Sequence, residues 1–443
     1  METFILPYKK KLIFLALGAE SAGNFSVFNN GKIYFSENFD DLLEENNWIK
    51  YQASILKYLR DNKIKPQIIL TDLHPLFKTT LWGEKLAKKF SAKFVQVQHH
   101  HAHIFSAIGD KILHNASYLL PPTFYGITMD GTGLGTDEKI WGGETFKVVS
   151  SKNKVESIER IGYLENQVMI GGDLAIKEPA RMLISILYKV FSNSSSPFGR
   201  GCRVLATGEG TSKIQHKKLI YNFVKKYYTK NEFELIYNQL QQNFNCLETS
   251  STGRVLDAVS FLLGFCENKR NYKHEPIDLL EKNSTKPYSE LKPRIIISEN
   301  KYVLDTTYLF NYIIKYLHKR DKYRLTTTAQ LYIAEGLYEI VKLSCHPERS
   351  PYSDEVEACL PARQGSTKYY NQPNYNADSS TSPSTRCTRS GFAQNDIFIA
   401  GGLANNKIIS DFFISKGAYA SKIIPLGDAG LSFGQIIYYL LQK

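Results

Sequence analysis

The chain has 443 residues, of which 43% are hydrophobic and 13% aromatic. This length is sufficient for two domains with sizeable cores. The sequence contains no run of about eighteen apolar residues, so it excludes a membrane-spanning helix and gives no sign of a membrane partner. The formal charge of +12 is not gathered into a Lys/Arg block, and neither zinc-finger spacing nor an RNA-binding signature is present. Nucleic acid is therefore an unsupported partner, and an anionic small substrate or an acidic protein explains the charge as well.

The six cysteines include no CxxC pair and no even framework of the kind found in secreted proteins. We therefore expect reduced thiols and a cytoplasmic location. Near the N-terminus, the apolar run Leu12–Leu17 is followed by no small-residue cleavage site. This favours a buried first strand over a signal peptide.

After this strand the chain breaks at Gly18–Gly23, and a hairpin is predicted. Residues 25–28 and 33–35 flank Asn30-Gly31, the dipeptide that most strongly indicates a two-residue hairpin turn. The chain therefore opens as a strand, a glycine-bearing turn and a hairpin.

A helix and a second buried strand are predicted next. Residues 40 to about 62 show the apolar period of an amphipathic helix. The face expected to be buried consists of Leu42, Ile49, Leu56 and Leu59. A buried strand over 68–70 then ends at Thr71-Asp72, and a helix over 82–90 follows.

Four of the ten histidines lie within the five residues 99–103. The cluster is predicted where the strand Phe94–Val97 meets a helix that includes Ile104–Ile108. His99 and His103 are four residues apart and would share one helix face, where two imidazoles can bind one metal ion. Further ligands must come from elsewhere, and carboxylates would favour iron, zinc or manganese over calcium. A solvated or hydrogen-bonded histidine run is the alternative interpretation.

The opening arrangement recurs in the middle of the chain. Tyr125–Asp130 is a predicted strand that ends in a glycine turn at 131–135, and a second hairpin is predicted through 140–141 and 145–149. Glycine turns of this kind let backbone N–H groups approach phosphate oxygens. Two such openings predict an α/β protein with two lobes on one plan and a cleft between them. This is the arrangement of the RNase H-like lobes in actin-like and sugar-kinase-like nucleotide-binding proteins. We place the first lobe at 1–120 and the second at 121–443.

The second half is predicted to be longer and more helical. Pro179 suits the first turn of a helix over 180–190, and residues 214–244 are predicted to be helical without evident chemistry. Thr249–Arg254 opens a further helix that contains Asp257. Its hydroxyls and free N–H groups make an anion site possible, although N-capping by Ser251 or Thr252 is the more frequent use of such residues.

A strand over 295–297 and helices over 307–319 and 328–343 precede a segment of different composition. Residues 344–394 are rich in Ser, Thr, Pro, Arg and Asn and poor in aliphatic residues, which predicts a disordered insertion.

Regular structure is predicted to return after the insertion. The strand Ile397–Ala400 leads into Gly401–Asn406 and a helix over 407–415, and Ile423-Ile424 is a predicted strand before Gly427–Gly430 and a last helix. Asp130 and Asp428 are thus each predicted to end a buried strand at a glycine turn. Open α/β sheets place their ligand groups at such positions.

Eight short motifs, spread over nearly the whole chain, resemble in type and order those of a known protein family. They are LGAES, TDLHP, VQHHHAH, MDGTGLG with IWGGE, GGDLAIKEPAR, TSSTGRVLDA, AGGLANN and GDAGLSFGQ. In this order they resemble the C-terminal half of the HypF-type carbamoyltransferases of nickel–iron hydrogenase maturation. The same domain is similar to the threonylcarbamoyl-adenosine transferases of tRNA modification and to antibiotic O-carbamoyltransferases, and VQHHHAH and TSSTGR favour the hydrogenase-maturation branch.

The resemblance implies that a carbamoyl group passes from carbamoyl-adenylate, held between the lobes, to the C-terminal cysteine of a HypE-like acceptor. It implies a divalent metal, iron or zinc or alternatively magnesium or manganese, and ATP or carbamoyl-adenylate as nucleotide ligand. Because the acceptor brings its own nucleophile, no catalytic side chain is expected in this chain. The implied metal ligands are His99, His103, Asp130 and Asp428. The implied nucleotide or substrate contacts are Gly131 and Gly133 at the phosphate, Asp257 at the ribose, Gly402 and Asn406 at the adenosine, and Asp173, Arg181, Gly253 and Gly401.

The resemblance also has departures. Family members usually carry an upstream acylphosphatase-like domain, a cysteine-rich zinc-finger region and a YrdC-like domain that makes the adenylate. We find none of these motifs and expect a stand-alone domain supplied by a separate YrdC-like protein. Two alternatives stay open: a nucleotide- and metal-binding remnant or partner subunit without turnover, and a carbamoyl- or threonylcarbamoyl-transferase acting on RNA or a small molecule.

Overall fold

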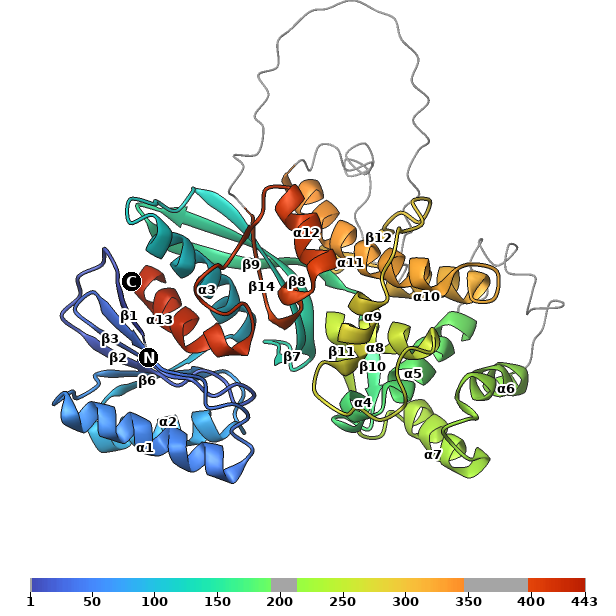
Figure 1. Cartoon of the computed structure of the whole chain (residues 1–443), viewed down its shortest axis with the longest axis horizontal. Coiled ribbons are helices and arrows are strands. Elements are labelled where there is room, and N and C mark those ends of the chain that lie inside the picture. The colour runs from blue at the N-terminus through green and yellow to red at the C-terminus, as the bar shows by residue number, and fades with distance from the viewer. Residues whose placement is uncertain (1, 193–212, 346–396, 443) are drawn as a thin grey trace, which may run out of the picture.

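A computed structural model describes residues 2–192, 213–345 and 397–442 (Figure 1). The first two residues of the predicted insertion, Ser344 and Cys345, end a long helix. The rest of the predicted insertion, through residue 394, lies outside the described residues.

The N-terminal part of the chain forms a six-stranded sheet in the order β1-β4-β3-β2-β5-β6. The predicted hairpin is confirmed: β3 and β4 pair antiparallel with Asn29 opposite Lys32, and Asn30 and Gly31 adopt φ angles of 46° and 87°. A strand at the N-terminus, β1, precedes the predicted first strand and pairs with β4. The strands are β1 (Glu2–Ile5), β2 (Ile13–Ala16), β3 (Ser26–Asn29), β4 (Lys32–Phe35), β5 (Ile68–Asp72) and β6 (Lys93–Val97).

Helices α1 (Glu45–Asp61) and α2 (Lys78–Phe90) pack on one face of this sheet. The predicted buried face of α1 was partly wrong, because Ile49 and Leu56 are 54% and 39% exposed. Tyr51 is buried instead, and its hydroxyl donates to the carbonyl oxygen of Leu17 at 2.7 Å. A tyrosine can fill the core when its polar end finds a backbone acceptor, and apolar periodicity does not reveal this.

The second sheet follows the order β12-β13-β9-β8-β7-β14-β15, and β10 and β11 pair beside β8. Two predictions here were wrong. The glycine-rich segment after Asp130 is not a turn, because β7 continues to Leu134 through an irregularity between Met129 and Gly133. The predicted second hairpin is one continuous strand, β8, which pairs with β7 and β9. The strands are β7 (Thr123–Leu134), β8 (Ile140–Ser151), β9 (Lys154–Leu164), β10 (Gln167–Ile170), β11 (Cys246–Thr249), β12 (Ile295–Ser298), β13 (Lys301–Leu304), β14 (Ile397–Ala400) and β15 (Tyr419–Ala420).

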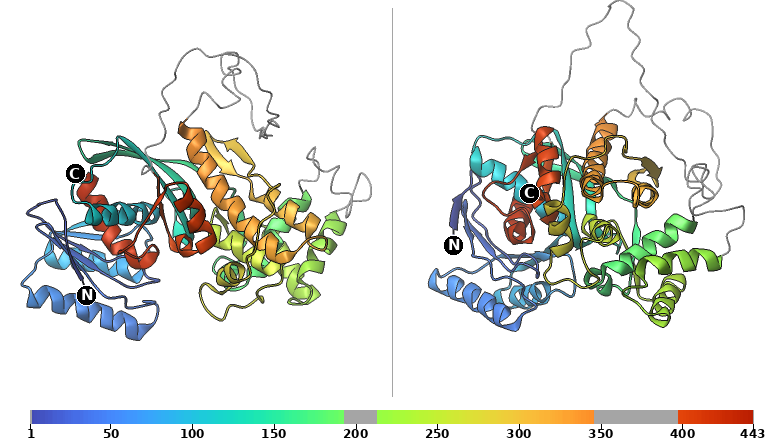
Figure 2. Two further views of the ribbon diagram at one scale, coloured as in Figure 1. Left: turned by 45° about the horizontal axis from the view of Figure 1, so that its top comes forward. Right: turned by 45° about the vertical axis from the view of Figure 1, so that its right-hand side comes forward.

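Most of the remaining helices gather beside the second sheet (Figures 1 and 2). The predicted helices at 180–190, 214–244, 307–319, 328–343 and 407–415 are all present, with 214–244 divided into two. The helices are α4 (Leu174–Lys177), α5 (Pro179–Ser192), α6 (Lys213–Val224), α7 (Lys230–Gln241), α8 (Thr252–Leu262), α9 (Glu275–Lys282), α10 (Thr306–Tyr316), α11 (Lys322–Cys345) and α12 (Lys407–Ser415). Within the described ranges, the helices are all too short or too polar to cross a membrane.

Two helices from distant parts of the chain, α3 (His99–His114) and α13 (Leu431–Gln442), lie side by side between the sheets (Figures 1 and 2). They share one apolar core with Phe14 of the first sheet and with Phe124 and Phe398 of the second. The lobe boundary that we propose at residue 120 therefore assigns α13 to the second lobe, although this helix packs on the sheet of the first lobe.

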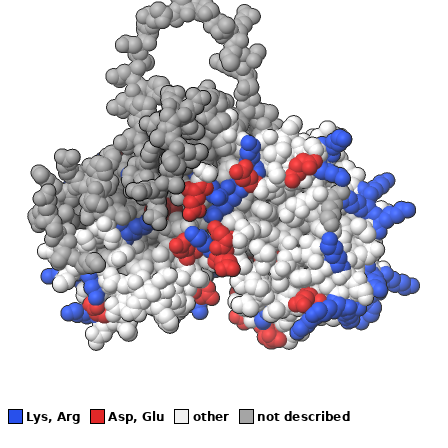
Figure 3. Space-filling view, turned by 180° about the vertical axis from the view of Figure 1, so that it is seen from behind, with Lys and Arg blue, Asp and Glu red and all other residues white. Residues whose placement is uncertain are grey.

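Figure 3 shows one face of the molecule, with a furrow between its two parts. Acidic and basic side chains gather along this furrow. Lys and Arg side chains spread over the part that carries α1 and α2.

The contact between α3 and α13 gives a stability prediction. A Cβ atom at Gly434 would lie 1.9 Å from the carbonyl oxygen of Ala102, so Gly434→Ala must push the two helices apart. We expect the free energy of unfolding to fall by about 2 kcal/mol or more. Urea denaturation measures it. Gly131→Ala is the matched control, because a Cβ there would meet nothing within 4 Å. Equal stability of the two variants would contradict the tight packing of α3 on α13.

Candidate functional site

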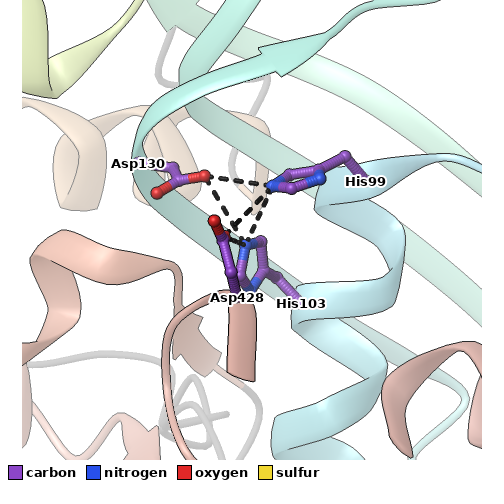
Figure 4. Close-up of side chains that lie close together, drawn as sticks. All are labelled: His99, His103, Asp130 and Asp428. Carbon is purple, nitrogen blue, oxygen red and sulfur yellow. Dashed lines mark hydrogen bonds and ion pairs between the residues drawn. The ribbon is translucent and has the colours of Figure 1, made fainter. Parts of the chain in front are cut away.

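Four side chains from three separate segments converge at the start of α3 (Figure 4). One ligand atom from each of His99, His103, Asp130 and Asp428 lies within 4.8 Å of the others. The Nε2 atoms of the two histidines are 3.2 Å apart. The Nε2 atom of His99 is 3.1 Å from Asp130 Oδ2 and 3.5 Å from Asp428 Oδ1, and that of His103 is 3.6 and 3.4 Å from the same two oxygens. This is a set of two imidazoles and two carboxylates around one point.

The histidines take their places from the first turn of α3. Gln98 caps the helix, since its side-chain oxygen accepts from the backbone N–H of His101 at 2.9 Å. The predicted i, i+4 face is confirmed for His99 and His103, whose side chains are 3% and 0% exposed. The other two histidines pack against aromatic rings, His100 against Trp141 and His101 against Phe146. Burial lowers the pKa of His101 to about 4. Only one face of the run therefore belongs to the cluster.

Asp130 lies inside β7, at its irregularity, rather than at the end of a strand. Its Oδ1 atom accepts from the backbone N–H of Gly402 at 3.2 Å. Its carbonyl oxygen accepts from the hydroxyl of Ser251, which also caps α8, at 3.1 Å. Asp130 is thus held by the segments that follow β14 and β11.

Asp428 begins the short 3₁₀ helix η4 (Asp428–Gly430), and the strand predicted at Ile423-Ile424 is absent. The backbone N–H groups of both isoleucines donate to Asp110 Oδ2 on α3, at 2.7 and 2.8 Å. They therefore bind a buried carboxylate instead of a neighbouring strand. Asp428 is further held by the hydroxyl of Ser21, which hydrogen-bonds its Oδ2 atom.

The charges of the cluster are strongly interdependent. Burial lowers the pKa of His99, but the carboxylates of Asp72, Asp130 and Asp428 outweigh it and raise that pKa well above its ordinary value. Burial raises the pKa of Asp428, but the two imidazoles outweigh it and hold that pKa well below its ordinary value. The two acids therefore stay ionised and draw positive charge to this point.

Two observations fit the cluster to a divalent cation. Asp428 Oδ1 is buried and has no hydrogen-bond partner, although two imidazole nitrogens lie within 3.5 Å of it. The Nδ1 atom of His99 lies 2.7 Å from Asp72 Oδ2, which leaves the Nε2 lone pair free to face the cluster when Nδ1 carries the proton. A carboxylate behind a histidine is the usual outer support of a metal ligand. Nitrogen and carboxylate donors together suit zinc, iron or manganese.

Four of the predicted nucleotide-contact glycines lie around Asp130. A Cβ at Gly253 would lie 2.9 Å from Gly131 Cα, and Gly402 touches Asp130 directly. Gly401 has a φ of +96°, and a Cβ there would lie 2.3 Å from the carbonyl oxygen of Met129. Gly133 instead faces the rings of His99 and His100 and serves the packing of β7.

The other predicted contacts make no described hydrogen bond or ion pair with the cluster. Asp257 is buried between two arginines, Arg254 at 2.6 Å and Arg270. Asn406 caps α12 and donates to Gln330 at 2.8 Å. Asp173 is exposed, and Arg181 pairs with Glu178 at 2.7 Å. Nucleotide contact by these four residues and by the five glycines stays a prediction.

Three residues at or near the site were missed from the sequence. Asp72 had a detectable signal, because it ends a buried parallel strand in the TDLHP motif. Asp110 and Lys273 had none, because each meets the Asp428 segment across more than a hundred residues of chain.

The chain matches two family models and several curated relatives. A model described as HypF Kae1-like domain matches residues 9–110, and one described as carbamoyltransferase, Kae1-like domain, second subdomain, matches residues 126–350, just over half of the chain. A probable carbamoyltransferase HypF of Methanocaldococcus jannaschii is 31% identical over 440 residues, which cover 97% of this chain and 46% of the relative. A carbamoyltransferase HypF homolog of Cupriavidus necator is 29% identical over 250 residues, 56% of this chain and 54% of the relative.

Solved structures extend the likeness to nearly the whole fold. The crystal structure of T. kodakarensis HypF has a TM-score of 0.73 at 25% identity and covers 99% of this chain and 48% of that one. Full-length HypF in a phosphate- and nucleotide-bound form also has a TM-score of 0.73, at 22% identity, and covers 99% of this chain and 47% of that one. The expected α/β fold of two actin-like lobes is thus confirmed. This chain spans about half the length of the relatives it matches, and it belongs to the HypF family of carbamoyltransferases through their Kae1-like domain.

Proposed function

We propose that this chain is a metal-dependent carbamoyltransferase that passes a carbamoyl group from carbamoyl-adenylate to an acceptor thiol, the C-terminal cysteine of a HypE-like protein, in nickel–iron hydrogenase maturation. The observation that carries the proposal is the convergence of two imidazoles and two carboxylates in a member of this family. A cytoplasmic location and a separate YrdC-like supplier of the adenylate are parts of the same proposal.

His99, His103, Asp130 and Asp428 would hold the cation. A divalent cation bound there would polarise a carbonyl or phosphoryl oxygen and would stabilise a leaving phosphate. Asp72 holds the imidazole of His99, and the backbone N–H of Gly402 holds Asp130. These residues keep the ligand atoms in place before substrate arrives, which is the condition for electrostatic stabilisation of the transition state.

The nucleophile comes from the acceptor protein. Its thiolate sulfur forms a bond to the carbamoyl carbon while the bond from that carbon to the phosphate oxygen breaks, which leaves a thiocarbamate and AMP. The thiol proton passes to solvent. Among the described cysteines, Cys266 is buried and its thiol pKa is raised to about 12 by burial, so it is unsuited to act as a nucleophile.

A transfer assay tests the proposal. The metal-loaded chain is mixed with enzymatically supplied carbamoyl-adenylate and a HypE-like protein, and mass spectrometry follows the acceptor. We expect the acceptor to gain the mass of one carbamoyl group at its terminal cysteine. An acceptor without that cysteine should gain nothing. If the chain binds metal and nucleotide but transfers nothing, its role is non-catalytic and the proposal is wrong. If the carbamoyl group passes to RNA or to a small molecule instead, the proposed acceptor is wrong.

Metal content tests the ligand set. His99→Ala and Asp428→Ala each remove one of four ligands, so we expect purified protein to lose most of its bound metal when measured by plasma mass spectrometry after dialysis. His318→Ala is the matched control, because His318 is exposed and outside the cluster. Unchanged metal content in both ligand variants would contradict the site.

Asp72 should act on the metal through His99. Asp72→Ala removes the acceptor from the Nδ1 atom of His99, and we expect metal affinity to fall by roughly 10- to 100-fold. Asp72→Asn keeps an acceptor oxygen and should lose less. Competition with a chromophoric chelator measures both, and Asp411→Ala on the exposed surface of α12 is the control. Wild-type affinity in Asp72→Ala would show that His99 needs no such support.

A further inference from the structure

We propose that Lys273, in the connection between α8 and α9, binds the phosphate of the nucleotide substrate at the open edge of the metal cluster. The inference rests on the proposed function and assigns one further residue to the same site.

The cluster is closed on its imidazole side and partly open on its carboxylate side. The side chains of His99 and His103 are 3% and 0% exposed, whereas those of Asp130 and Asp428 are 10% and 15% exposed. A substrate therefore reaches the cation past the carboxylates. Lys273 stands at this edge, with Nζ 3.7 Å from Asp428 Oδ2 and a side chain that is 58% exposed.

The backbone beside Lys273 is anchored in the protein. Arg270 donates from one nitrogen to the carbonyl oxygen of Lys273 at 2.8 Å and from another to the buried carboxylate of Asp257. Asn271 pairs with Glu275, the first residue of α9, at 2.6 Å. The backbone of Lys273 is therefore held in place while its long side chain stays free to rotate. Such a side chain can pair with Asp428 or with a bound phosphate.

Charge balance identifies the second partner. A divalent cation held by Asp130 and Asp428 would neutralise both carboxylates and would repel the Lys273 ammonium. The ammonium then gains most from an anion that the cation also attracts, and a phosphate oxygen of a nucleotide meets this requirement. Gly131, which follows Asp130 in the chain, leaves room beside that carboxylate, since a Cβ there would meet nothing within 4 Å.

The test compares AMP with adenosine, because the two ligands differ only in the phosphate. Calorimetry measures the binding of both ligands to four metal-loaded proteins: wild type, Lys273→Gln, Lys273→Arg and Lys269→Gln. Lys269→Gln is the control, because Lys269 is an exposed lysine of the same connection. We expect Lys273→Gln to weaken AMP binding roughly tenfold, as loss of one charge-assisted hydrogen bond does, and to leave adenosine binding unchanged. Lys273→Arg should retain most of the AMP affinity, and metal content should be the same in all four proteins.

Three results would overturn the inference, and they separate it from the proposed function. If Lys273→Gln binds AMP as tightly as wild type, Lys273 does not bind the phosphate, while the nucleotide site stands. If the variant instead gains metal affinity without a change in AMP binding, Lys273 competes with the cation rather than assisting it. If wild type binds neither AMP nor adenosine, the proposed nucleotide site fails and the role of Lys273 fails with it.

Discussion

The structure depends on the placement of two aspartates, one buried and one largely buried, against two imidazoles at the start of α3. Buried carboxylates are strongly unfavourable unless positive charge and hydrogen-bond donors compensate them. The chain provides these from segments that are far apart in sequence, namely the first turn of α3, the irregular part of β7 and the η4 turn. The packing of α3 and α13 between two sheets holds these segments together. The packing that forms the fold therefore also brings the four ligand side chains of the cation site together.

The sequence predicted those elements whose signals are local. The Asn30-Gly31 hairpin was predictable because its turn requires two positive φ angles, and most helices were predictable from their apolar period. Predictions failed where a distant partner decides the conformation. The isoleucines at 423 and 424 suggest a strand, but their N–H groups bind Asp110 on α3. Gly131 and Gly133 suggest a turn, but β7 continues through both of them. Gly133 lets the strand pass close to the rings of His99 and His100.

The same difference between local signals and distant contacts applies to the candidate site. The i, i+4 spacing of His99 and His103 was enough to predict one shared face, because helix geometry fixes it. Asp130 and Asp428 were singled out because each was predicted to end a strand at a glycine turn, although neither ends a strand in the structure. Only the resemblance of ordered motifs joined them to the two histidines, since no local rule connects residues 130 and 428. Lys273 lies in a basic connection that looks like solvated surface in the sequence. Only the structure brings it to Asp428.

X-ray absorption spectroscopy of the chain loaded with one zinc or iron ion tests the central claim most directly. The account predicts a first coordination shell of nitrogen and oxygen atoms with the multiple-scattering signal of two imidazoles and no sulfur. It also predicts that one of those imidazole contributions disappears in His103→Ala. A shell that contains sulfur, or one with no imidazole signal, would contradict the account.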